Sequence, residues 1–402
     1  MGIIVQKFGG SSVANAEKIY NVAGRIQDAY DTGNSVVVVV SAQGDTTDDL
    51  IEKAAEINEK PSKREMDVLL STGEQITIAL LAMALENNKY PVVSLTGWQT
   101  PIKTNMVYGS ARIEKVETTR LINELDKGRI VIVAGFQGVN SVNDITTLGR
   151  GGSDTTAVAL AAALRADVCE IYTDVDGVYT CDPRIVPDAR KLNDISYDEM
   201  LELASLGANV LHNRSVEMAK KYHVDLEVKS SFQKVAGTKV KEAGSVEKLL
   251  VRGVARDNDV ARIAVLGIDD TPGKAYRMFA LLAKKNINVD VILQSIGRDN
   301  TKDISFTVSR SQMEEAVKVL NENLEDIGAK EITHDEKISK VSIVGSGMLS
   351  NPGVAAKMFE ALYDANINIR MISTSEIKVS VLIDEEMAEK AVQAIHHKFF
   401  KD

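Results

Sequence analysis

The sequence predicts an α/β fold in which a mostly parallel sheet is sandwiched by helices and is followed by two small α+β modules. Two observations lead to this prediction. Residues 1–245 alternate short apolar runs with longer helical patterns, which is typical of parallel sheets covered by helices. Beyond residue 260, a pattern of Pro-Gly followed by Asn-Ile-Asn occurs twice, which indicates a duplicated unit.

The composition bounds the class of protein. The chain has 402 residues, enough for two or more domains, and 47 Lys+Arg against 57 Asp+Glu give a net charge of −10. This acidic balance argues against nucleic acid or a membrane surface as a partner. Cys169 and Cys181 cannot form a disulfide framework, and no apolar run reaches the ~20 residues of a membrane-spanning helix. We therefore expect a soluble, cytoplasmic protein with reduced thiols.

Six apolar runs are expected to form the first sheet, at residues 3–8, 36–40, 92–95, 130–134, 170–173 and 226–230. Helical patterns lie between them, among others at 48–58, 65–86 and 154–165. Ligands of parallel α/β sheets bind at the carboxyl ends of the strands. The loops that follow the apolar runs are therefore the expected site.

The first of these loops carries a lysine and two glycines, Lys7, Gly9 and Gly10. A lysine at the end of a buried strand is costly unless an anion meets it. The glycines let backbone N–H groups approach that anion, and a following helix N-terminus favours negative charge. The pattern predicts a nucleotide phosphate site, although Lys7 by itself could also extend to solvent.

A second glycine-rich stretch, residues 149–156, precedes a strong helix-forming segment. We expect Ser153 to be the N-cap of that helix. The loop then offers free N–H donors beside Arg150, which could clamp a carboxylate in bidentate fashion. The alternative is an ordinary helix start with a surface arginine, but the crowding of glycines around one cation and one acid, Asp154, favours a site.

Three further segments contribute candidate residues that are ambiguous when taken one at a time. Glu74 follows a glycine inside a helical pattern, where glycine costs about 1 kcal/mol against alanine, so a close approach of another group is expected. Ser41 and Thr47 follow a strand and could equally be turn or cap residues, as Glu74 could be a solvated helix charge. The acidic loop at 173–184 could border a nucleotide or be a capped turn.

Metal and general-base chemistry find no support in the motifs. The chain contains no His-Glu-x-x-His motif and no Cys-x-x-Cys pair, so no dedicated metal cage is expected. Neither a Walker A loop nor Gly-x-Gly-x-x-Gly is present. None of the five histidines lies in a motif, and His212 and His223 are expected to be cap or surface residues.

The C-terminal part contains the duplication, at residues 265–295 and 343–375. The spacing from Pro272 to Ile287 equals that from Pro352 to Ile367, and each proline stands at an expected helix start. The glycine-containing region 240–256 is expected to be a boundary. We therefore expect a first domain at 1–245 and two modules at 262–335 and 340–402.

Taken together, the motifs resemble those of aspartate kinases in the amino-acid-kinase superfamily, and the repeats resemble the tandem, ferredoxin-like ACT modules of that family. The matching segments are Lys7–Ser12, Val40–Asp48, Ser71–Glu74, Gly149–Thr156 and Thr173–Tyr179. The resemblance covers nearly the whole chain. It implies phosphorylation of the side-chain carboxylate of L-aspartate by MgATP to 4-phospho-L-aspartate, the entry to lysine, threonine and methionine synthesis.

The resemblance also implies roles for single residues. Glu74 would hold the substrate ammonium, Arg150 a substrate carboxylate, and Asp154 would orient Lys7 or the substrate. The implied catalytic residues are Lys7, Arg150 and Asp154. The implied aspartate-binding residues are Ser41, Thr47, Glu74, Arg150, Gly151, Gly152 and Ser153. The implied ATP-binding residues are Lys7, Gly9, Gly10, Ser11, Thr173, Asp174, Tyr179 and Arg184, with Mg²⁺ bound mainly through the phosphates. Many relatives carry lysine near Asn209, and Leu-His-Pro-Arg where this chain has residues 211–214.

Effector lysine, sometimes with threonine, binds between ACT modules of two subunits in that family. The resemblance thus implies a homo-oligomer formed through the modules. The candidate effector residues are Thr271, Gly273, Lys274, Ala275, Asp290, Gln294, Asn351 and Asn368. The alternative is that the repeats form only a dimerisation scaffold.

An aspartate carboxyl has a reference pKa of about 3.9 and is already ionised at pH 7, so no general base is needed. The obstacle is an anion attacking an anion, and catalysis should rest on positioning and charge neutralisation. Two alternatives stay open. One is another superfamily kinase acting on glutamate, carbamate or a nucleoside monophosphate. The other is an amino-acid sensor whose first domain only binds nucleotide.

Overall fold

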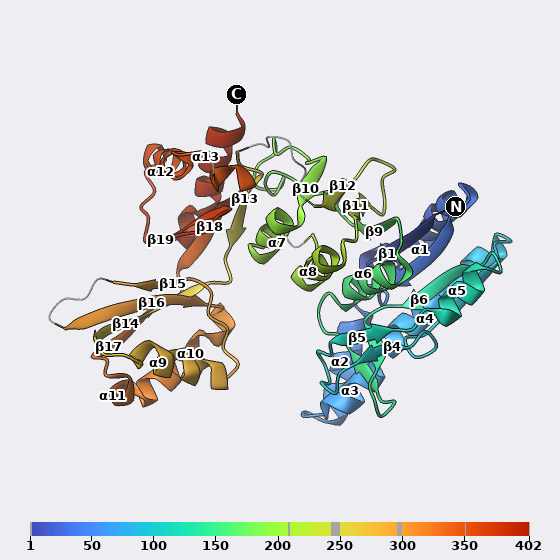
Figure 1. Ribbon diagram of the computed structural model, residues 1–402, viewed down its shortest axis with the longest axis horizontal. Helices are drawn as coiled ribbons and strands as arrows, with labels where there is room; N and C mark the ends of the chain where they lie inside the picture. Colours follow the sequence, from blue (N-terminus) through green and yellow to red (C-terminus); the bar gives the residue numbers. More distant parts are fainter. Residues whose placement is uncertain (1, 208–209, 243–249, 296–299, 350, 402) are drawn as a thin grey trace. The chain divides into compact units, whose positions relative to one another are not determined.

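A computed structural model describes residues 2–207, 210–242, 250–295, 300–349 and 351–401. The chain forms two compact units. The first comprises Met1–Tyr179, Lys191–Ser205 and Asn209–Val246, and the second comprises Thr180–Arg190, Leu206–Ala208 and Glu247–Asp402. Figure 1 shows the elements of both units.

The first unit is built on an eight-stranded sheet in the order β10-β12-β11-β9-β1-β2-β6-β3. All neighbouring strands are parallel except β11 and β12. The predicted mostly parallel sheet is confirmed, and four of the six predicted strands have the predicted bounds. The strands are β1 (Ile3–Phe8), β2 (Ser35–Val40), β3 (Val92–Leu95), β6 (Ile130–Ala134), β9 (Val168–Thr173), β10 (Asp194–Ser196), β11 (Leu226–Ser230) and β12 (Thr238–Lys241).

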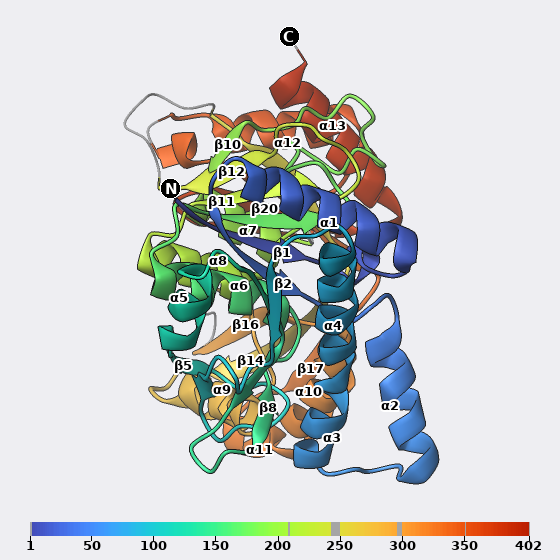
Figure 2. The same ribbon diagram turned by 90° about the vertical axis from the view of Figure 1, so that its right-hand side faces the viewer.

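Helices cover both faces of this sheet, as predicted. Alternate residues of β2, such as Val36 and Val38, pack with α1 and α4 in one apolar core, and Figure 2 shows these two helices side by side. Helix α6 packs on β1, β2 and β9, with α8 against it. The helices are α1 (Ala16–Asp31), α2 (Thr46–Ile57), α3 (Lys63–Leu70), α4 (Thr72–Asn87), α5 (Thr119–Leu125), α6 (Gly152–Leu164), α7 (Tyr197–Ser205) and α8 (Asn213–Tyr222), with the 3₁₀ turn η1 (Gly10–Ser12).

The helix predicted at 65–86 is two helices, α3 and α4, that meet at Ser71. Among the described residues, the stretch Lys63–Asn87 is long enough and apolar enough to cross a membrane. Half of its most apolar part is buried inside the protein. Core helices meet the same criterion. The sequence did not predict a second, four-stranded sheet in this unit, which consists of β4 (Ile102–Thr104), β5 (Ile113–Val116), β7 (Gln137–Val139) and β8 (Ile145–Thr147).

The second unit contains two similar modules, each a four-stranded antiparallel sheet with helices. The sheet orders are β15-β16-β14-β17 and β13-β18-β20-β19. Helices α9 and α12 begin directly after Gly273 and Gly353, both in the left-handed region, as the two Pro-Gly pairs predict. The elements are β13 (Gly253–Asp257), β14 (Ala261–Asp269), α9 (Lys274–Lys284), β15 (Ile292–Gln294), β16 (Thr301–Val308), α10 (Arg310–Glu322), α11 (Leu324–Ile327), β17 (Glu331–Asp335), β18 (Ile338–Val344), η2 (Ser346–Leu349), α12 (Val354–Asp364), β19 (Met371–Thr374), β20 (Lys378–Asp384), η3 (Glu385–Met387) and α13 (Ala388–Phe400).

Two segments differ from the domain organisation that the sequence predicts. The expected boundary at 240–256 contains the end of β12 and most of β13, which pairs with β18 of the second module; residues 243–249 lie outside the described part. Residues 180–190, from within the stretch expected to form the first domain, belong to the second unit. Both segments are stabilised by contacts with residues distant in sequence, which local patterns do not reveal.

Gly135, directly after β6, allows the close approach of two other elements. A Cβ at this position would lie 2.6 Å from Ser153 Oγ and 2.9 Å from the Val40 carbonyl oxygen. We therefore expect Gly135→Ala to lower the free energy of unfolding by about 1–3 kcal/mol. Urea unfolding of the full chain, with a signal from the first unit, measures this change in the free energy of unfolding.

Gly24→Ala is the matched control, because Gly24 lies inside α1 with no atom within 4 Å of the added Cβ. Alanine there should raise the free energy of unfolding by about 0.5–1 kcal/mol through helix propensity. Equal effects of the two substitutions would contradict the steric explanation.

Candidate active site

The predicted loops lie at one edge of the first sheet. Strands β9, β1, β2 and β6 are adjacent and parallel, so their carboxyl ends meet. The loops that follow begin at Gly9, Ser41, Gly135 and Asp174. This edge therefore brings together the glycine loop after β1, the polar turn after β2 and the acidic loop after β9.

Lys7 and Asp154 form the central ion pair of this edge. The Lys7 ammonium lies 2.7 Å from Asp154 Oδ1, and the two side chains are only 12% and 13% exposed. Lys7 comes from the central strand β1, and Asp154 from the first turn of α6. Because α6 packs directly on β1, these two predicted site residues are held together by the core of the unit.

The glycines of the first loop allow close backbone packing. A Cβ on Gly10 would lie 2.7 Å from the Ala42 carbonyl oxygen, and the Gly44 N–H donates to the Gly10 carbonyl at 3.1 Å. A Cβ on Gly9 would lie 3.4 Å from Lys7 Nζ, so the loop closely approaches the ammonium. The glycine pair therefore keeps the loop after β1 against the loop after β2.

Glu74 is the most perturbed acid of the site. Its side chain is buried in the first turn of α4; Oε1 accepts the Ala42 N–H at 3.1 Å, and Oε2 has no hydrogen-bond partner among the described residues. Burial raises the pKa of Glu74 to about 8. The close approach expected beside Glu74 is real, because a Cβ on Gly73 would lie 2.7 Å from Ala42 Cβ. A buried carboxylate oxygen without a partner is suited to a ligand cation.

The second glycine loop turns sharply ahead of α6. Gly149 and Gly151 have φ of +77° and +67°, which disfavours any residue with a Cβ. The helix begins at Gly152 with Gly151 as its N-cap, so the prediction of Ser153 as N-cap is wrong by two residues. Arg150 is exposed on this loop and forms no ion pair with a residue that the structure describes.

Two residues that sequence reasoning did not assign to the site support this loop. A Cβ on Gly151 would overlap the ring of His212, with the nearest atom at 2.2 Å. Arg214 donates to the carbonyl oxygens of Leu148 and Ala111 at 2.8 and 2.7 Å. Both residues belong to the Leu-His-Asn-Arg segment at 211–214, which is the feature of the sequence that could have pointed to them. His212 and His223 are the N-cap and C-cap of α8, as expected for cap residues.

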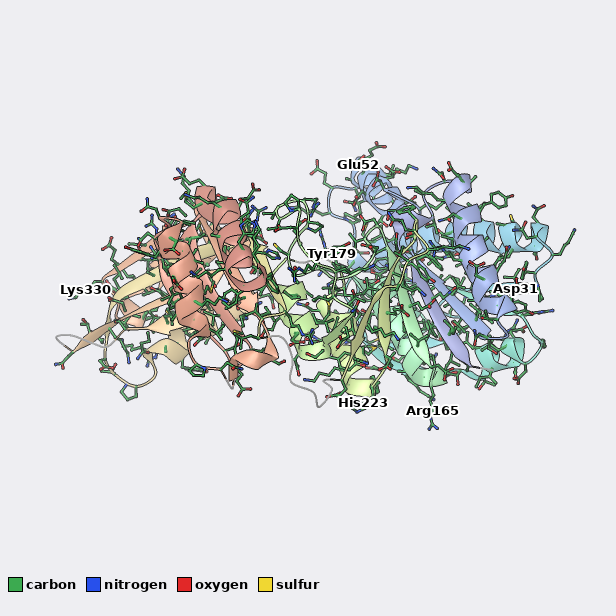
Figure 3. All side chains as sticks on the ribbon, turned by 90° about the horizontal axis from the view of Figure 1, so that it is seen from above. Asp31, Glu52, Arg165, Tyr179, His223 and Lys330 are labelled. Atoms are coloured by element: carbon green, nitrogen blue, oxygen red, sulfur yellow. The ribbon has the colours of Figure 1, made fainter. Side chains whose placement is uncertain are left out.

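The loop after β9 lies beside the first glycine loop. Thr173 Oγ1 donates to Asp174, and the Thr173 carbonyl accepts from Ser231, whose hydroxyl is 2.5 Å from that of Ser12. Tyr179, labelled in Figure 3, donates to Asp176 at 2.8 Å. Ser231 was not predicted, although it directly follows β11 at the same edge.

Four residues named in the sequence analysis remain to be placed. Ser41 and Thr47 are half-buried after β2 and in the first turn of α2, respectively. Arg184 belongs to the second unit, where its guanidinium contacts Asp182. Asn209 lies outside the described residues.

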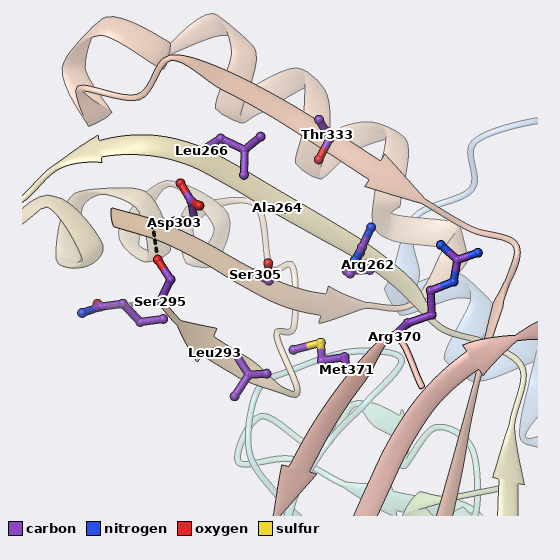
Figure 4. A pocket seen from close by; sticks show the side chains of 11 residues that line it. Arg262, Ala264, Leu266, Leu293, Ser295, Asp303, Ser305, Thr333, Arg370 and Met371 are labelled. Atoms are coloured by element: carbon purple, nitrogen blue, oxygen red, sulfur yellow. Dashed lines mark hydrogen bonds between the residues drawn. The ribbon is translucent and has the colours of Figure 1, made fainter. Parts of the chain in front are cut away.

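The eight candidate effector residues lie at several positions in the two modules. Gln294 lines a cavity of about 530 Å³ to which both modules contribute, Arg262 from the first and Arg370 from the second. Figure 4 shows these two arginines. Asp290 accepts a hydrogen bond from the ammonium of Lys340 at 2.6 Å, an interaction between the two modules. Five of the remaining candidates lie near the starts of α9 and α12, namely Thr271, Gly273, Lys274, Ala275 and Asn351. Asn368 lies between the end of α12 and β19.

Two bonds anchor residues near these helix starts. The Lys274 ammonium lies 3.7 Å from Asp269, and the Asn351 amide donates to the Gly347 carbonyl at 2.9 Å. In the part of the chain that the structure describes, no group of three or more His, Cys, Asp or Glu side chains is arranged to hold a metal ion.

Comparisons with known proteins identify the family of this chain. The chain matches the Amino acid kinase family over residues 2–230 and the ACT domain over residues 263–324 and 341–399. It is 54% identical over 400 residues to the aspartokinase of Geobacillus stearothermophilus, covering 99% of this chain and 97% of that protein. Aspartokinase 2 of Bacillus subtilis is also 54% identical, covering 99% of this chain and 98% of that protein.

Among solved structures, E. coli aspartokinase III in complex with aspartate and ADP superimposes with a TM-score of 0.83 at 26% identity. The same protein in complex with lysine and aspartate superimposes with a TM-score of 0.79. Both comparisons cover 99% of this chain and all of the other. The family match over more than half of the chain and the full-length relatives show that this chain belongs to the amino acid kinase family and, within it, to the aspartokinases.

Proposed function

We propose that the protein transfers the terminal phosphoryl group of ATP to the side-chain carboxylate of L-aspartate, which yields 4-phospho-L-aspartate. The observation that carries this proposal is the buried Lys7–Asp154 pair at the carboxyl edge of the sheet, between two glycine-rich loops. The E. coli aspartokinase III complex with aspartate and ADP supports the same substrates for this chain. The product would enter lysine, threonine and methionine synthesis in the cytoplasm.

The chemistry of this transfer needs charge neutralisation more than proton removal. The substrate carboxylate is ionised at pH 7 and attacks a phosphorus surrounded by negative oxygens. Lys7 is a cation at the edge where the nucleotide loop lies, and Asp154 holds its ammonium in place. Such a fixed cation stabilises charge on the transferring group in the transition state without reorganisation during the reaction.

Glu74 and Arg150 divide the recognition of the amino acid between them. The unpartnered Oε2 of Glu74 is suited to the substrate ammonium, and the exposed guanidinium of Arg150 is suited to a carboxylate. Ser41 and Thr47, together with the loop at 151–153, complete the aspartate site. Opposite charges at the two ends of the site would select an α-amino acid over a simple dicarboxylate.

ATP would be held by Gly9, Gly10, Ser11, Thr173, Asp174, Tyr179 and Arg184, together with Lys7. The donor set fits a Mg²⁺ ion bound through phosphates, because the described residues contain no cluster of three metal-ligating side chains and Mg²⁺ takes few protein ligands. Bound in this way, the ion would neutralise phosphate charge. The protein residues then bind and orient the nucleotide.

We propose further that the two modules bind an effector amino acid and join subunits into a homo-oligomer. The E. coli aspartokinase III complex with lysine supports lysine as the effector. Threonine is the second candidate effector, acting in concert with lysine. The site would include Thr271, Gly273, Lys274, Ala275, Asp290, Gln294, Asn351 and Asn368. The catalytic domain would comprise residues 1–245, and the modules 262–335 and 340–402.

Trapping of the acyl phosphate with hydroxylamine tests the proposed activity. With ATP and Mg²⁺ present, we expect hydroxamate from aspartate and none above background from glutamate. Hydroxamate from glutamate but not aspartate would identify a different superfamily kinase. ATP binding without turnover of either acid would indicate a sensor.

Lys7→Met should lower kcat at least about a hundredfold, because a positioned charge is lost from the transition state. The Lys220→Met variant is the control, since Lys220 pairs with Asp198 at the surface of α8. Circular dichroism would verify that both variants fold. Turnover of a folded Lys7→Met variant at the wild-type rate would contradict the mechanism.

The pKa of Glu74 predicts a pH dependence of aspartate binding. Below about pH 8 the free enzyme holds Glu74 protonated, and the proton must leave before the carboxylate can accept an ammonium. The KM for aspartate should therefore fall as pH rises from 6 to 8, by up to about tenfold per pH unit, and level off above. Initial rates at varied aspartate concentration and several pH values measure this change in KM.

Glu74→Gln should raise the KM for aspartate and remove most of this pH dependence. Glu86→Gln, in the exposed last turn of the same helix, should behave as wild type. The proposed role of Glu74 is wrong if the Gln variant keeps the wild-type slope.

Asp290→Asn tests the effector site. Lysine and threonine are titrated singly and together against the wild-type chain and the variant. We expect the lysine concentration for half-inhibition to rise at least about fivefold in the variant, with the uninhibited rate within about twofold. Glu314→Gln, on the exposed side of α10, is the control. An unchanged lysine response of Asp290→Asn would place the effector elsewhere.

A further inference from the structure

Residues 180–190 leave the first unit and return to it within a short stretch of chain. The chain passes into the second unit after Tyr179 and returns at Lys191. The segment follows directly on the loop after β9 that is proposed to bind nucleotide. It also carries Arg184, a proposed ATP-binding residue.

Within the second unit, this segment is part of the core of the second module. Cys181 and Val186 are buried together with residues of β18, α12 and α13. The Val254 N–H of β13 donates to the Thr180 carbonyl at 2.8 Å, and Gln393 of α13 donates to the Ile185 carbonyl at 3.0 Å. The segment is thus anchored by apolar packing and by hydrogen bonds.

The two crossings of the chain are hydrogen-bonded to each other. The Leu192 N–H donates to the Val178 carbonyl at 2.8 Å, Tyr179 and Lys191 form an antiparallel bridge, and the Thr180 N–H donates to the Arg190 carbonyl at 2.9 Å. The outgoing and returning strands therefore form one ladder. These contacts join the outgoing and returning segments at one β-bridge, outside the named strands.

His396 of α13 is hydrogen-bonded to this ladder at Thr180. Its Nε2 lies 2.9 Å from Thr180 Oγ1, which also accepts the Arg190 N–H at 2.9 Å. The imidazole is 2% exposed and stacks on Phe400 with ring centroids 4.7 Å apart. A single hydroxyl thus joins both strands of the ladder to the last helix of the regulatory module.

We infer that His396 is a positioning residue for ATP: through Thr180 and the 178–192 ladder, the second ACT module sets the geometry of the nucleotide loop 173–179 and of Arg184. The inference rests on the proposed function and adds the route by which the regulatory module acts on that site. Nucleotide binding and the state of α13 are then thermodynamically linked, and each must respond to the other.

His396→Phe tests the inference, because phenylalanine keeps the ring stacked on Phe400 and removes the hydrogen bond to Thr180. We expect the KM for ATP to rise about fivefold, with kcat and the KM for aspartate within about twofold. His396→Gln places an amide near the Nε2 position and should restore most of the wild-type KM for ATP. Thr180→Val should reproduce the effect of His396→Phe.

Lys398→Met is the matched control on the same helix. Lys398 pairs with Glu360 and Asp364 of α12. Its KM for ATP should be that of the wild type. An equal rise of KM in the control, or a fall in melting temperature of His396→Phe without a change in KM for ATP, would overturn the inference and leave His396 a purely structural residue.

A second measurement needs no variant. Hydrogen exchange of the wild-type full chain is followed with and without saturating ADP and Mg²⁺. We expect slower exchange in residues 180–190 and in α13 when ADP is bound. Protection confined to the first unit would overturn the inference. Wild-type protein without aspartate-dependent turnover, but with ADP-dependent protection of α13, would instead refute the proposed function alone.

Discussion

The ion pair between Lys7 and Asp154 is the interaction on which the rest of the active site depends. It brings the central strand of the sheet and the first turn of α6 together at one point. Both side chains are mostly withdrawn from water, so the attraction between them is only weakly screened. The loops that follow β9, β1, β2 and β6 surround the pair at the same edge of the sheet.

Glycine makes this arrangement possible by allowing backbones to meet. Gly10, Gly73 and Gly135 each approach another element more closely than a Cβ would permit. A side chain at any of these positions would push apart the backbones next to Lys7 in β1 and Glu74 in α4. The burial that raises the pKa of Glu74 is a consequence of this tight packing.

The two modules of the second unit differ in which parts of the chain form their cores. The first module has its own apolar core, whereas the second incorporates β13 and residues 180–190 from elsewhere in the chain. These additions enlarge the second core and tie it to the chain beside the nucleotide loop.

The sequence by itself determined the class of fold, the bounds of four strands of the first sheet and the duplication, because these depend on local periodicity and on the spacing of the Pro-Gly pairs. Only the tertiary structure decided which residues meet. Gly151 rather than Ser153 caps α6 because of the left-handed turn, and His212 and Arg214 support that loop from α8. The transfer of 180–190 to the second unit arises from burial of Cys181 and Val186 among side chains distant in sequence, which no local pattern encodes.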